Sequence, residues 1–586
     1  MRKDWRIHNL AADFNGLGQK LGVDPVVIRV MRNRGIIEDE DYRSFLYGTL
    51  ADTHAPELML DMELGADIIS SGIDGGESIR IVGDYDVDGV TSTYVLYDAI
   101  KKLGGNVSYD IPHRIRDGYG INERIVMDAY NDGVSMIVTC DNGIAAVEAI
   151  NKAVELGMTV VVTDHHEIPP ELPNADAIIN PHQEGDGYPF KDICGCEVAY
   201  KLIQTLYKFR EEELDPRAYL EIVALATNCD VMPLVDENRI YVKEGLKELE
   251  CTSNIGLRAL INASELADKK LSTYHLGFVL GPCLNAAGKL EDAKEALELL
   301  LTEDPAFAEK RAMELKILND ERKNETEQGT NSAASSVKLE EIEGELQPVD
   351  KVIVEYLPGI HEGVAGVIAG RVRERYGRPT IIFTDTDGDP DILKGSGRSV
   401  EVYNMFEKID EHRDLTVKFG GHPMAAGLSI KREVLDEFRT KLNEDAGLTY
   451  GELIPKLMID VPMPMYYASM KLAEELGTLE PFGKQNEKPL FAEANMEIVG
   501  IRIFGNARKM LSLTVKDKQG RKFTVKSFEV DGFLEDIKRW FKTEECDKMM
   551  QGIETGCKID IAYELSINEF RGERNLEFMM RAYNKA

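Results

Sequence analysis

The chain has 586 residues, of which 43% are hydrophobic and 29% charged, a composition typical of a folded protein with several domains. Its 69 basic and 103 acidic side chains give a formal charge of −34, which argues against a protein that coats nucleic acid with a wholly basic surface. A narrow basic groove on an acidic body is still compatible with this balance. No stretch approaches the roughly 20 apolar residues of a membrane span, and we expect neither a signal peptide nor a membrane anchor.

Eight cysteines are spread along the chain, and none of them forms a Cys-x-x-Cys pair. Cys194 and Cys196 are separated by a single residue, a spacing that disfavours a structural zinc site. We therefore expect reduced thiols and a cytoplasmic location.

The first half of the chain carries an α/β pattern. Residues 1–75 are predicted to be mostly helical, and strand and helix signals alternate from about residue 78. Strands are predicted in SIRIVGDYD, NVSYDIP, VSMIVTCDNG and MTVVVTDHHE, with helical segments between them. This alternation is typical of a parallel sheet covered by helices, in which ligands bind beyond the carboxyl ends of the strands.

The second half changes its pattern twice. Residues 303–340 are highly charged and are predicted to form a long connecting helix, and a second α/β alternation begins near residue 350. After about residue 490 short alternating strands predominate, which favours a small β-barrel or sandwich.

Acidic and histidine side chains follow four of the predicted apolar runs. They are Asp84, Asp86 and Asp88 in GDYDVDG, Asp141 in TCDNG, Asp164, His165 and His166 in TDHHE, and Asp230 in NCDVM. A single aspartate in such a place is commonly a turn or helix N-cap residue. Four groups that converge on one sheet edge would repel one another unless cations bind between them, and carboxylates with imidazole suit Mn²⁺ or Mg²⁺. Two such ions are the usual catalysts of phosphoester hydrolysis.

Several motifs resemble a known family. GDYDVDG, DNG at 141–143 and DHH at 164–166 resemble the DHH phosphoesterase superfamily, and GSGRS at 395–399 and FGGHPMAAG at 419–427 resemble its DHHA1 domain. Together with NAAG at 285–288, EPFGKQNEKPLF at 480–491 and the C-terminal β region, their order is similar to that of the RecJ family of single-strand-specific DNA exonucleases. The resemblance covers about residues 75–586.

The resemblance implies an α/β fold class, with a parallel-sheet DHH lobe and a smaller α/β DHHA1 lobe joined by a long helix and followed by an OB-like β-barrel. We expect the segments to be 1–75, an N-terminal and mostly helical part; 76–302, the metal-binding catalytic domain; 303–345, the connecting helix; 346–447, the phosphate-binding domain; and 448–586, the nucleic-acid-binding domain.

The resemblance also implies roles for the matched residues. Two Mn²⁺ or Mg²⁺ ions would be held by Asp84, Asp86, Asp88, Asp141, His165 and Asp230, with Asp141 between them. His166 would lie beside the scissile phosphate, next to the ligands or as a proton donor. Substrate phosphates would be held by Ser396, Arg398 and His422, and by Arg114 at a 5′ end, although Arg114 could equally be a solvated loop charge.

The sequence departs from the family near the expected DNA path. Asn285 in NAAG would contact DNA, but Cys283 and Lys289 stand where many relatives carry arginine. These changes leave the proposed metal ligands intact and concern only how tightly the DNA backbone is held.

Basic side chains gather in the C-terminal β region. Arg502, Arg508, Lys509, Lys516 and Lys522 are interleaved with Phe504 and Phe523. OB-folds bind single strands with cations on the phosphates and aromatic rings under the bases. A solvated strand face would give the same pattern, so both interpretations stay open.

The resemblance implies a metal-dependent 5′→3′ exonuclease that hydrolyses single-stranded DNA to 5′-mononucleotides in DNA repair and recombination. It also implies a monomer that cooperates with single-strand-binding protein and a RecQ-type helicase. Two alternatives remain: a DHH/DHHA1 phosphodiesterase of short oligonucleotides or cyclic dinucleotides, and a non-catalytic single-strand DNA-binding scaffold. The former would lack the region after residue 450, and the latter need not fill every ligand position.

Overall fold

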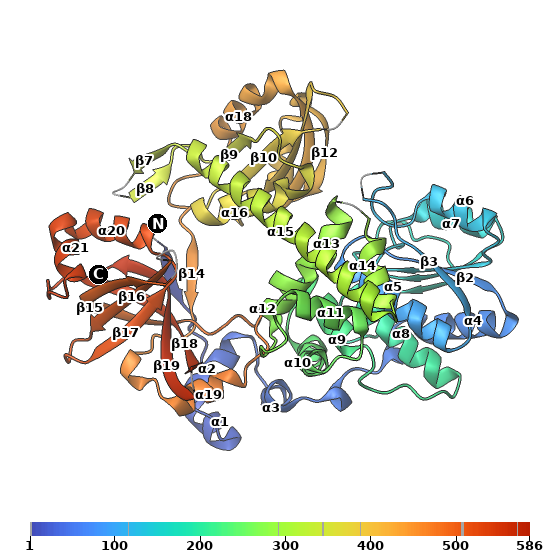
Figure 1. Ribbon diagram of the computed structural model, residues 1–586, viewed down its shortest axis with the longest axis horizontal. Helices are drawn as coiled ribbons and strands as arrows, with labels where there is room; N and C mark the ends of the chain where they lie inside the picture. The colour runs from blue at the N-terminus through green and yellow to red at the C-terminus, as the bar shows by residue number, and fades with distance from the viewer. Residues whose placement is uncertain are drawn as a thin grey trace. The chain divides into compact units, whose positions relative to one another are not determined.

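The computed structural model describes residues 3–114, 116–290, 292–342, 345–386, 388–505, 509–570 and 572–586 (Figure 1). Contacts divide the chain into two compact units. The first contains Met1–Ile37, Arg322–Thr478 and Lys488–Ala586, and the second contains Glu38–Glu321 and Leu479–Glu487. The long helix α15 (Pro305–Ser336) begins in the second unit and ends in the first. Within the described ranges, no helix combines the length and apolar character needed to cross a membrane.

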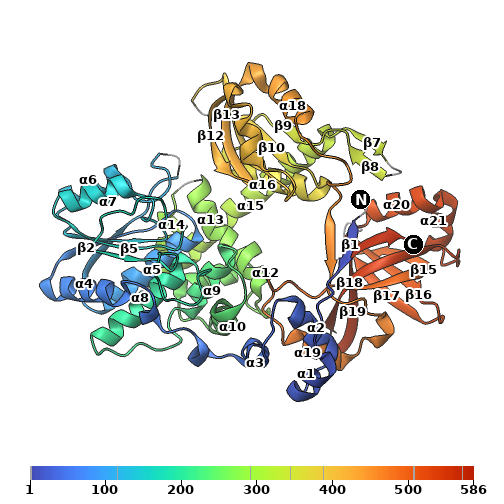
Figure 2. The ribbon, with the colours of Figure 1, turned by 180° about the vertical axis from the view of Figure 1, so that it is seen from behind.

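A five-stranded parallel sheet forms the centre of the second unit (Figure 2). Its strands run in the order β3-β2-β4-β5-β6, with β2 (Ser78–Val82), β3 (Asn106–Asp110), β4 (Met136–Cys140), β5 (Thr159–Thr163) and β6 (Ala177–Ile179). The strand order reverses between β2 and β4, because β3 lies on the far side of β2. In open α/β sheets such a reversal leaves a crevice at the carboxyl ends of the strands, and ligands bind there.

Helices cover both faces of this sheet. One face packs against α4 (Met62–Gly75), α5 (Val87–Lys102) and α8 (Gly195–Phe209), and the other against α6 (Glu123–Asn131) and α7 (Val147–Glu155). Alternate strand residues point to opposite faces, so β4, which is buried throughout, contributes to both hydrophobic cores. Burial on both faces explains why the central strands are continuous apolar runs rather than alternating ones.

The remainder of the second unit is helical. Its elements are α3 (Asp39–Tyr47), η1 (Leu50–Asp52), η2 (Pro56–Leu58), α9 (Leu220–Cys229), α10 (Asp236–Glu250), α11 (Ile255–Ala263), α12 (Thr273–His275), the π-helix η3 (Leu276–Leu280), α13 (Gly281–Leu290) and α14 (Lys294–Leu301). Here α5, α8 and α9 pack side by side, which fixes the end of α9 relative to the sheet.

The first unit contains a second α/β layer structure. Its sheet has the order β12-β13-β11-β10-β9, with β9 (Ile353–Tyr356), β10 (Thr380–Asp385), β11 (Ile392–Arg398), β12 (Thr416–His422) and β13 (Ala425–Lys431). One face is partly covered by α16 (Glu362–Tyr376), and the other by α17 (Met405–Asp410), η4 (Arg413–Leu415), η5 (Arg432–Val434) and α18 (Leu435–Glu444). The hairpin of β7 (Leu339–Ile342) and β8 (Glu345–Pro348) precedes this sheet.

A closed five-stranded barrel ends the first unit. Its order is β15-β16-β17-β19-β18, with β15 (Phe491–Phe504), β16 (Met510–Lys516), β17 (Lys522–Ser527), β18 (Lys558–Phe570) and β19 (Glu573–Lys585). Two helices, α20 (Asp531–Phe541) and α21 (Thr543–Met550), lie between β17 and β18 in the chain. The predicted parallel sheet, connecting helix and terminal barrel are confirmed.

The N-terminal residues divide between the units. Strand β1 (Asp4–Ile7) pairs in parallel with β14 (Lys456–Ile459), and α1 (Phe14–Leu21) and α2 (Pro25–Asn33) belong to the same unit as η6 (Met465–Tyr467) and α19 (Met470–Gly477). A buried ion pair of 2.7 Å between Arg34 and Asp460 holds them there. In contrast, α4 covers the parallel sheet of the second unit, so the stretch predicted as one segment serves both units.

Candidate metal centre

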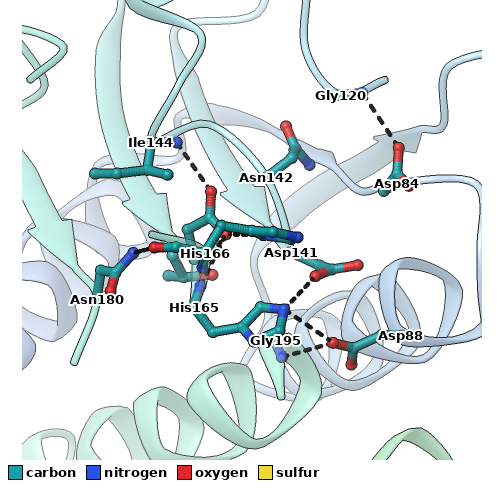
Figure 3. A network of polar contacts seen from close by, with 12 residues as sticks. Asp84, Asp88, Gly120, Asp141, Asn142, Ile144, His165, His166, Asn180 and Gly195 are labelled. Atoms are coloured by element: carbon teal, nitrogen blue, oxygen red, sulfur yellow. Dashed lines mark hydrogen bonds and ion pairs between the residues drawn. The ribbon is translucent and has the colours of Figure 1, made fainter. Parts of the chain in front are cut away.

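The loops at the carboxyl ends of β2, β4 and β5 bring the predicted ligands together (Figure 3). His165, which follows β5, has its Nε2 atom 3.1 Å from Asp141 Oδ1 and 3.7 Å from Asp88 Oδ2. The same nitrogen lies 3.7 Å from Asp230 Oδ2, at the end of α9. The crevice at the reversal of strand order therefore contains a compact set of carboxylates around one imidazole.

Three overlapping groups of side chains have ligand atoms that lie within 4.8 Å of one another. The groups are Asp84, Asp86 and Asp141; Asp88, His165 and Asp230; and Asp141, His165 and His166. Because the third group shares Asp141 with the first and His165 with the second, the ligand sets are continuous. Neighbouring cation positions that share a carboxylate are the arrangement that two-metal phosphoesterases use.

Two buried atoms of this cluster fit a cation particularly well. In the described part of the chain, His165 Nε2 and Asp230 Oδ2 are buried and have no hydrogen-bond partner. A buried polar atom without a partner costs free energy, and coordination to a cation would remove that cost. Carboxylate oxygens with one or two imidazole nitrogens suit Mn²⁺ or Mg²⁺.

The electrostatics of the cluster also favour bound cations. Burial first, and repulsion from neighbouring carboxylates second, raise the pKa of Asp84 to about 7 and that of Asp230 to about 8. The same two causes, burial and the charge of Asp88, raise the pKa values of Asp86 and Asp141. Divalent cations would reverse this effect, because they stabilise the ionised carboxylates.

The N-terminus of α8 holds the Asp88 carboxylate in place. The amide of Gly195 donates to Asp88 Oδ2 at 2.7 Å, and the amide of Cys196 donates to Oδ1 at 2.8 Å. These amides belong to the first turn of α8, where backbone N–H groups lack partners within the helix and attract negative charge. Neither amide was predicted, and the only signal was a glycine between two cysteines at a helix start.

Asp86 has a structural role as well as a place among the candidate ligands. Its side chain caps α5 by accepting a hydrogen bond of 3.1 Å from the amide of Gly89. Gly89 in turn packs so closely on the loop that a β-carbon there would lie 2.4 Å from the carbonyl oxygen of Asp84. The N-cap and ligand interpretations of this motif are therefore compatible, since a capping carboxylate retains lone pairs for a cation.

Strained backbone occurs at two positions of the centre. Asp141 has φ 59°, and Val231, directly after Asp230, has φ 56°. Positive φ is uncommon for residues other than glycine and is a genuine outlier for a β-branched residue. Such strain concentrates at functional sites, and here it fixes the directions of two candidate ligands. Asn142 supports the turn at Asp141 by donating hydrogen bonds to the carbonyl oxygens of Val82 and Cys140.

His166 belongs to a separate polar chain beside the ligands. Its Nδ1 lies 2.7 Å from Asp164 Oδ1, and Asp164 Oδ2 accepts a bond of 2.9 Å from the amide of Ile144. Burial lowers the pKa of His166, but the Asp164 bond and the surrounding carboxylates outweigh it and raise the pKa to about 9. The Tyr119 hydroxyl donates to the carbonyl oxygen of Asp141 at 2.8 Å and lies 3.2 Å from His166 Nδ1. Tyr119 was absent from the predicted set, because one tyrosine in a loop carries no sequence signal.

Two segments that carry predicted phosphate and DNA contacts, the loop after β3 and helix α13, approach Tyr85 in the loop that carries Asp84. The guanidinium carbon of Arg114 is 5.6 Å from the centroid of the Tyr85 ring. Helix α13, which carries Asn285, approaches the same loop, and a β-carbon on Gly288 would lie 2.3 Å from the carbonyl oxygen of Tyr85. Cys283 is buried beside Asn319 at 3.3 Å, whereas the side chain of Lys289 lies outside the described part of the chain.

Ser396, Arg398 and His422 share one face of the sheet in the first unit. Arg398 and His422 both pair with Ala425, so they lie in one row across β11, β13 and β12. Ser396 lies two residues along β11, on the same face, and Arg398 Nη1 donates to its Oγ at 3.2 Å. A β-carbon on Gly427, which pairs with Ser396, would meet no atom within 4 Å. This open strip, lined by a guanidinium, a hydroxyl and an imidazole, suits a phosphate group.

The predicted cations of the barrel differ in their surroundings. Lys516 pairs with Glu497 at 3.2 Å and Glu554 at 2.7 Å, and Lys522 also pairs with Glu554. Arg502 and Lys509 are exposed, and Arg502 lines a surface pocket with Phe504. Arg508 lies outside the described residues. The barrel surface is therefore less basic than the sequence suggests.

Comparison with known proteins identifies three family models in chain order. The DHH family N-terminal domain matches residues 78–227, the DHHA1 domain matches residues 350–447, and the RecJ OB domain matches residues 459–582. The single-stranded-DNA-specific exonuclease RecJ of Bacillus subtilis is 36% identical over 98% of this chain and 70% of its own length. RecJ of Escherichia coli is 33% identical over 95% of each chain.

Solved structures give the same result. RecJ from Thermus thermophilus in complex with Mn²⁺ has a TM-score of 0.79 and 26% identity, and the match covers 100% of this chain and 80% of that one. A structure of the same protein in complex with Mg²⁺ has a TM-score of 0.75, at 25% identity over 100% and 78% of the two chains. On the strength of these matches, the chain belongs to the RecJ family.

Proposed function

We propose that this chain is a metal-dependent exonuclease that hydrolyses single-stranded DNA from the 5′ end to 5′-mononucleotides. The observation that carries the proposal is the continuous ligand set around Asp141 and His165, in which buried nitrogen and oxygen atoms have no other partner among the described residues. The curated relatives at 33–36% identity are named single-stranded-DNA-specific exonucleases, which supports the same substrate here.

Two Mn²⁺ or Mg²⁺ ions would be held by Asp84, Asp86, Asp88, Asp141, His165 and Asp230. When bound, such ions acidify water and neutralise the negative charge of the reacting phosphate. The protein contributes by fixing the ligands in advance, through the α8 amides on Asp88 and the strained turns at Asp141 and Val231. A preorganised site needs little rearrangement as charge develops in the transition state.

His166 would protonate the leaving oxygen. Asp164 orients the ring through Nδ1, and the raised pKa favours the imidazolium form that can donate a proton. Bound cations would oppose this protonation, and the Asp164 carboxylate compensates for part of that opposition. The Tyr119 hydroxyl, which donates a hydrogen bond to the carbonyl oxygen of Asp141, supports this arrangement.

A substrate phosphate would bind on the open strip of the sheet β12-β13-β11-β10-β9 in the first unit, held by Ser396, Arg398 and His422. Arg114 would bind a terminal 5′-phosphate. A planar guanidinium can contact two phosphate oxygens at once, which a lysine cannot. Arg502, Lys509 and Phe504 on the barrel would bind the strand further along, with cations on phosphates and the ring beneath a base.

In the cell we propose a cytoplasmic monomer that works in DNA repair and recombination. An enzyme that accepts only an unpaired strand needs another protein to expose one, and the resemblance to the RecJ family implies a RecQ-type helicase and single-strand-binding protein as the partners.

A labelled digestion tests the function. A single-stranded oligonucleotide labelled at either end, its duplex form and a dinucleotide are each incubated with Mn²⁺ and with chelator. Mononucleotides released from the 5′ end of the single strand, only with metal, are the expected result. Rapid cleavage of the dinucleotide with the long strand untouched would indicate the small-substrate phosphodiesterase, and binding without cleavage would indicate the scaffold.

A further inference from the structure

Two aromatic side chains are stacked on each other and exposed in the second unit. Tyr274 in α12 and Phe278 in η3 have 61% and 66% of their surface exposed. Their ring centroids are 5.3 Å apart and their planes differ by 21°. Single exposed aromatic residues are common, whereas two that adjoin and stack present a continuous apolar surface of the kind that binding sites use.

The segment that carries the aromatic pair packs onto the end of α9, directly before Asp230. Asn228 Nδ2 donates to the carbonyl oxygen of Thr273 at 3.1 Å. A β-carbon on Gly281 would lie 2.2 Å from Cys229 Sγ, so only glycine permits this approach. Between these contacts the helix widens into the π-turn η3, a feature that is frequent at functional sites. The residues that support the pair are thus the two that directly precede the candidate ligand.

A segment distant in sequence also reaches this corner. Leu479–Glu487, which we call the clasp, belongs to the same compact unit as the metal centre. Thr273 Oγ1 donates to the carbonyl oxygen of Phe482 at 2.7 Å. The amide of Leu234 donates to the carbonyl oxygen of Lys484 at 2.8 Å. The clasp is therefore fixed between the start of α12 and the turn that follows Asp230.

Lys484 provides a positive charge near the ligands. Its side chain is exposed. Its carbonyl oxygen accepts the hydrogen bond of 2.8 Å from the amide of Leu234, a residue four positions beyond Asp230, which places this lysine at the turn that follows the candidate ligand. An exposed ammonium on this turn can contact a phosphate group of a bound strand.

We propose that Tyr274 and Phe278 form a stacking platform for an unpaired nucleobase of the substrate strand, and that Lys484 contacts the adjoining phosphate. The proposal rests on the proposed function and adds to it a way of selecting single strands within the metal-binding unit itself. Base–aromatic stacking needs an accessible base face, which an unpaired nucleotide offers and an intact duplex does not. Because every base has such a face, the platform would accept any sequence.

An abasic scan tests the platform on the full chain. Single-stranded oligonucleotides carry one abasic nucleotide at successive positions from the 5′ end, and kcat/KM is measured with Mn²⁺ for each. In the wild type, an abasic nucleotide at one position is expected to lower kcat/KM about tenfold, which is the effect of losing a single stacked base. In the double variant Y274A/F278A, kcat/KM on the intact strand is expected to fall by about the same factor. Removal of that base should then cause no further decrease in kcat/KM.

Two control variants make the result specific. Tyr274→Phe retains the ring and should keep the discrimination of the wild type against the abasic strand. Phe209→Ala removes an aromatic residue that is 51% exposed at the end of α8, away from the platform, and should also behave as the wild type. Thermal melting of each variant checks that the fold is intact.

Salt dependence tests Lys484. Replacing Lys484 by alanine is expected to weaken binding equally for intact and abasic strands and to reduce the slope of log affinity against log salt by about 0.7, as for one lost phosphate contact on a single strand. Lys152→Ala, on α7 at the other face of the sheet, should leave the slope unchanged.

The outcomes separate the two proposals. If the wild type degrades the strand and Y274A/F278A keeps the full abasic penalty, the platform is overturned and the proposed function stands. If the wild type cleaves only a dinucleotide and leaves the strand intact, the proposed function fails and the platform fails with it. An unchanged salt slope in K484A overturns the phosphate contact alone.

Discussion

The amide of Gly195 donates a hydrogen bond of 2.7 Å to Asp88, and a β-carbon on the same residue would lie 2.7 Å from the β-carbon of Asp141. One glycine thus lets the N-terminus of α8 approach two candidate ligands at once. The helix end contributes two amide donors and the positive end of its dipole to a cluster of buried carboxylates.

Gly195→Ala should therefore damage the centre without removing any ligand. The added methyl group would push α8 away from Asp141 and lengthen the amide bonds to Asp88, and loss of such supporting contacts typically costs about 10–100-fold in metal affinity or activity. Titration with Mn²⁺ and kcat/KM on single-stranded DNA measure the effect. Gly370→Ala in α16 is the matched control, because a β-carbon there would meet nothing within 4 Å. Equal behaviour of the two variants would contradict the role of the α8 end.

Replacing Asp141 by asparagine should abolish turnover while preserving or raising the stability of the metal-free protein. The wild-type carboxyl is buried among like charges, which raises its pKa and disfavours its ionised form. An isosteric amide removes that repulsion, so the melting temperature without metal should not fall. Addition of Mn²⁺ should stabilise the wild type but not the variant. Retained turnover at saturating Mn²⁺ would remove Asp141 from the centre.

Stabilisation by Mn²⁺ should grow with pH. Folding raises the pKa of Asp84 to about 7 and that of Asp230 to about 8, above their values in the unfolded chain. The folded metal-free protein therefore binds more protons than the unfolded one between about pH 4 and pH 8, and its stability falls as pH rises through this window. Bound cations replace those protons, so the increase in melting temperature on adding Mn²⁺ should be larger at pH 8 than at pH 6. Melting curves at several pH values measure it, and an increase that is independent of pH would contradict the electrostatic account.

His166→Ala should slow hydrolysis most where the leaving group needs a proton. General acid catalysis contributes about 10²–10⁴-fold, so loss of this order is expected with DNA, whose leaving oxygen is strongly basic. A p-nitrophenyl ester of a nucleotide has a weakly basic leaving group, and the variant should lose much less with it. Asp164→Asn, which alters the group that orients His166, should show the same selectivity in weaker form. Equal losses on both substrates would indicate that His166 acts in another way.

The position of the centre could be predicted because it follows from strand order. Asp84, Asp141 and His165 each follow a buried apolar run, and parallel strands present their carboxyl ends at one edge. The barrel could be predicted from alternating short strands. Backbone amides carry no such signal, so the α8 contacts to Asp88 could not be anticipated, and the clasp was recognised only as a family motif.

Pairing across strands explains why the basic character of the barrel was overestimated. Lys516 lies opposite Glu497 in the register of β15 and β16, and opposite charges at such positions interact directly. A linear count of lysines and arginines does not contain this information, because the partner is distant in sequence. Of the predicted cations that the structure describes, Arg502, Lys509 and Lys522 keep exposed side chains, and Lys522 also pairs with Glu554.

Anomalous diffraction from crystals grown with Mn²⁺ tests the central claim most directly. The account predicts two manganese peaks close together, with Asp141 contacting both, His165 contacting one of them, and both peaks lost in Asp141→Asn. A single peak, or peaks that avoid Asp141 and His165, would contradict the two-metal centre.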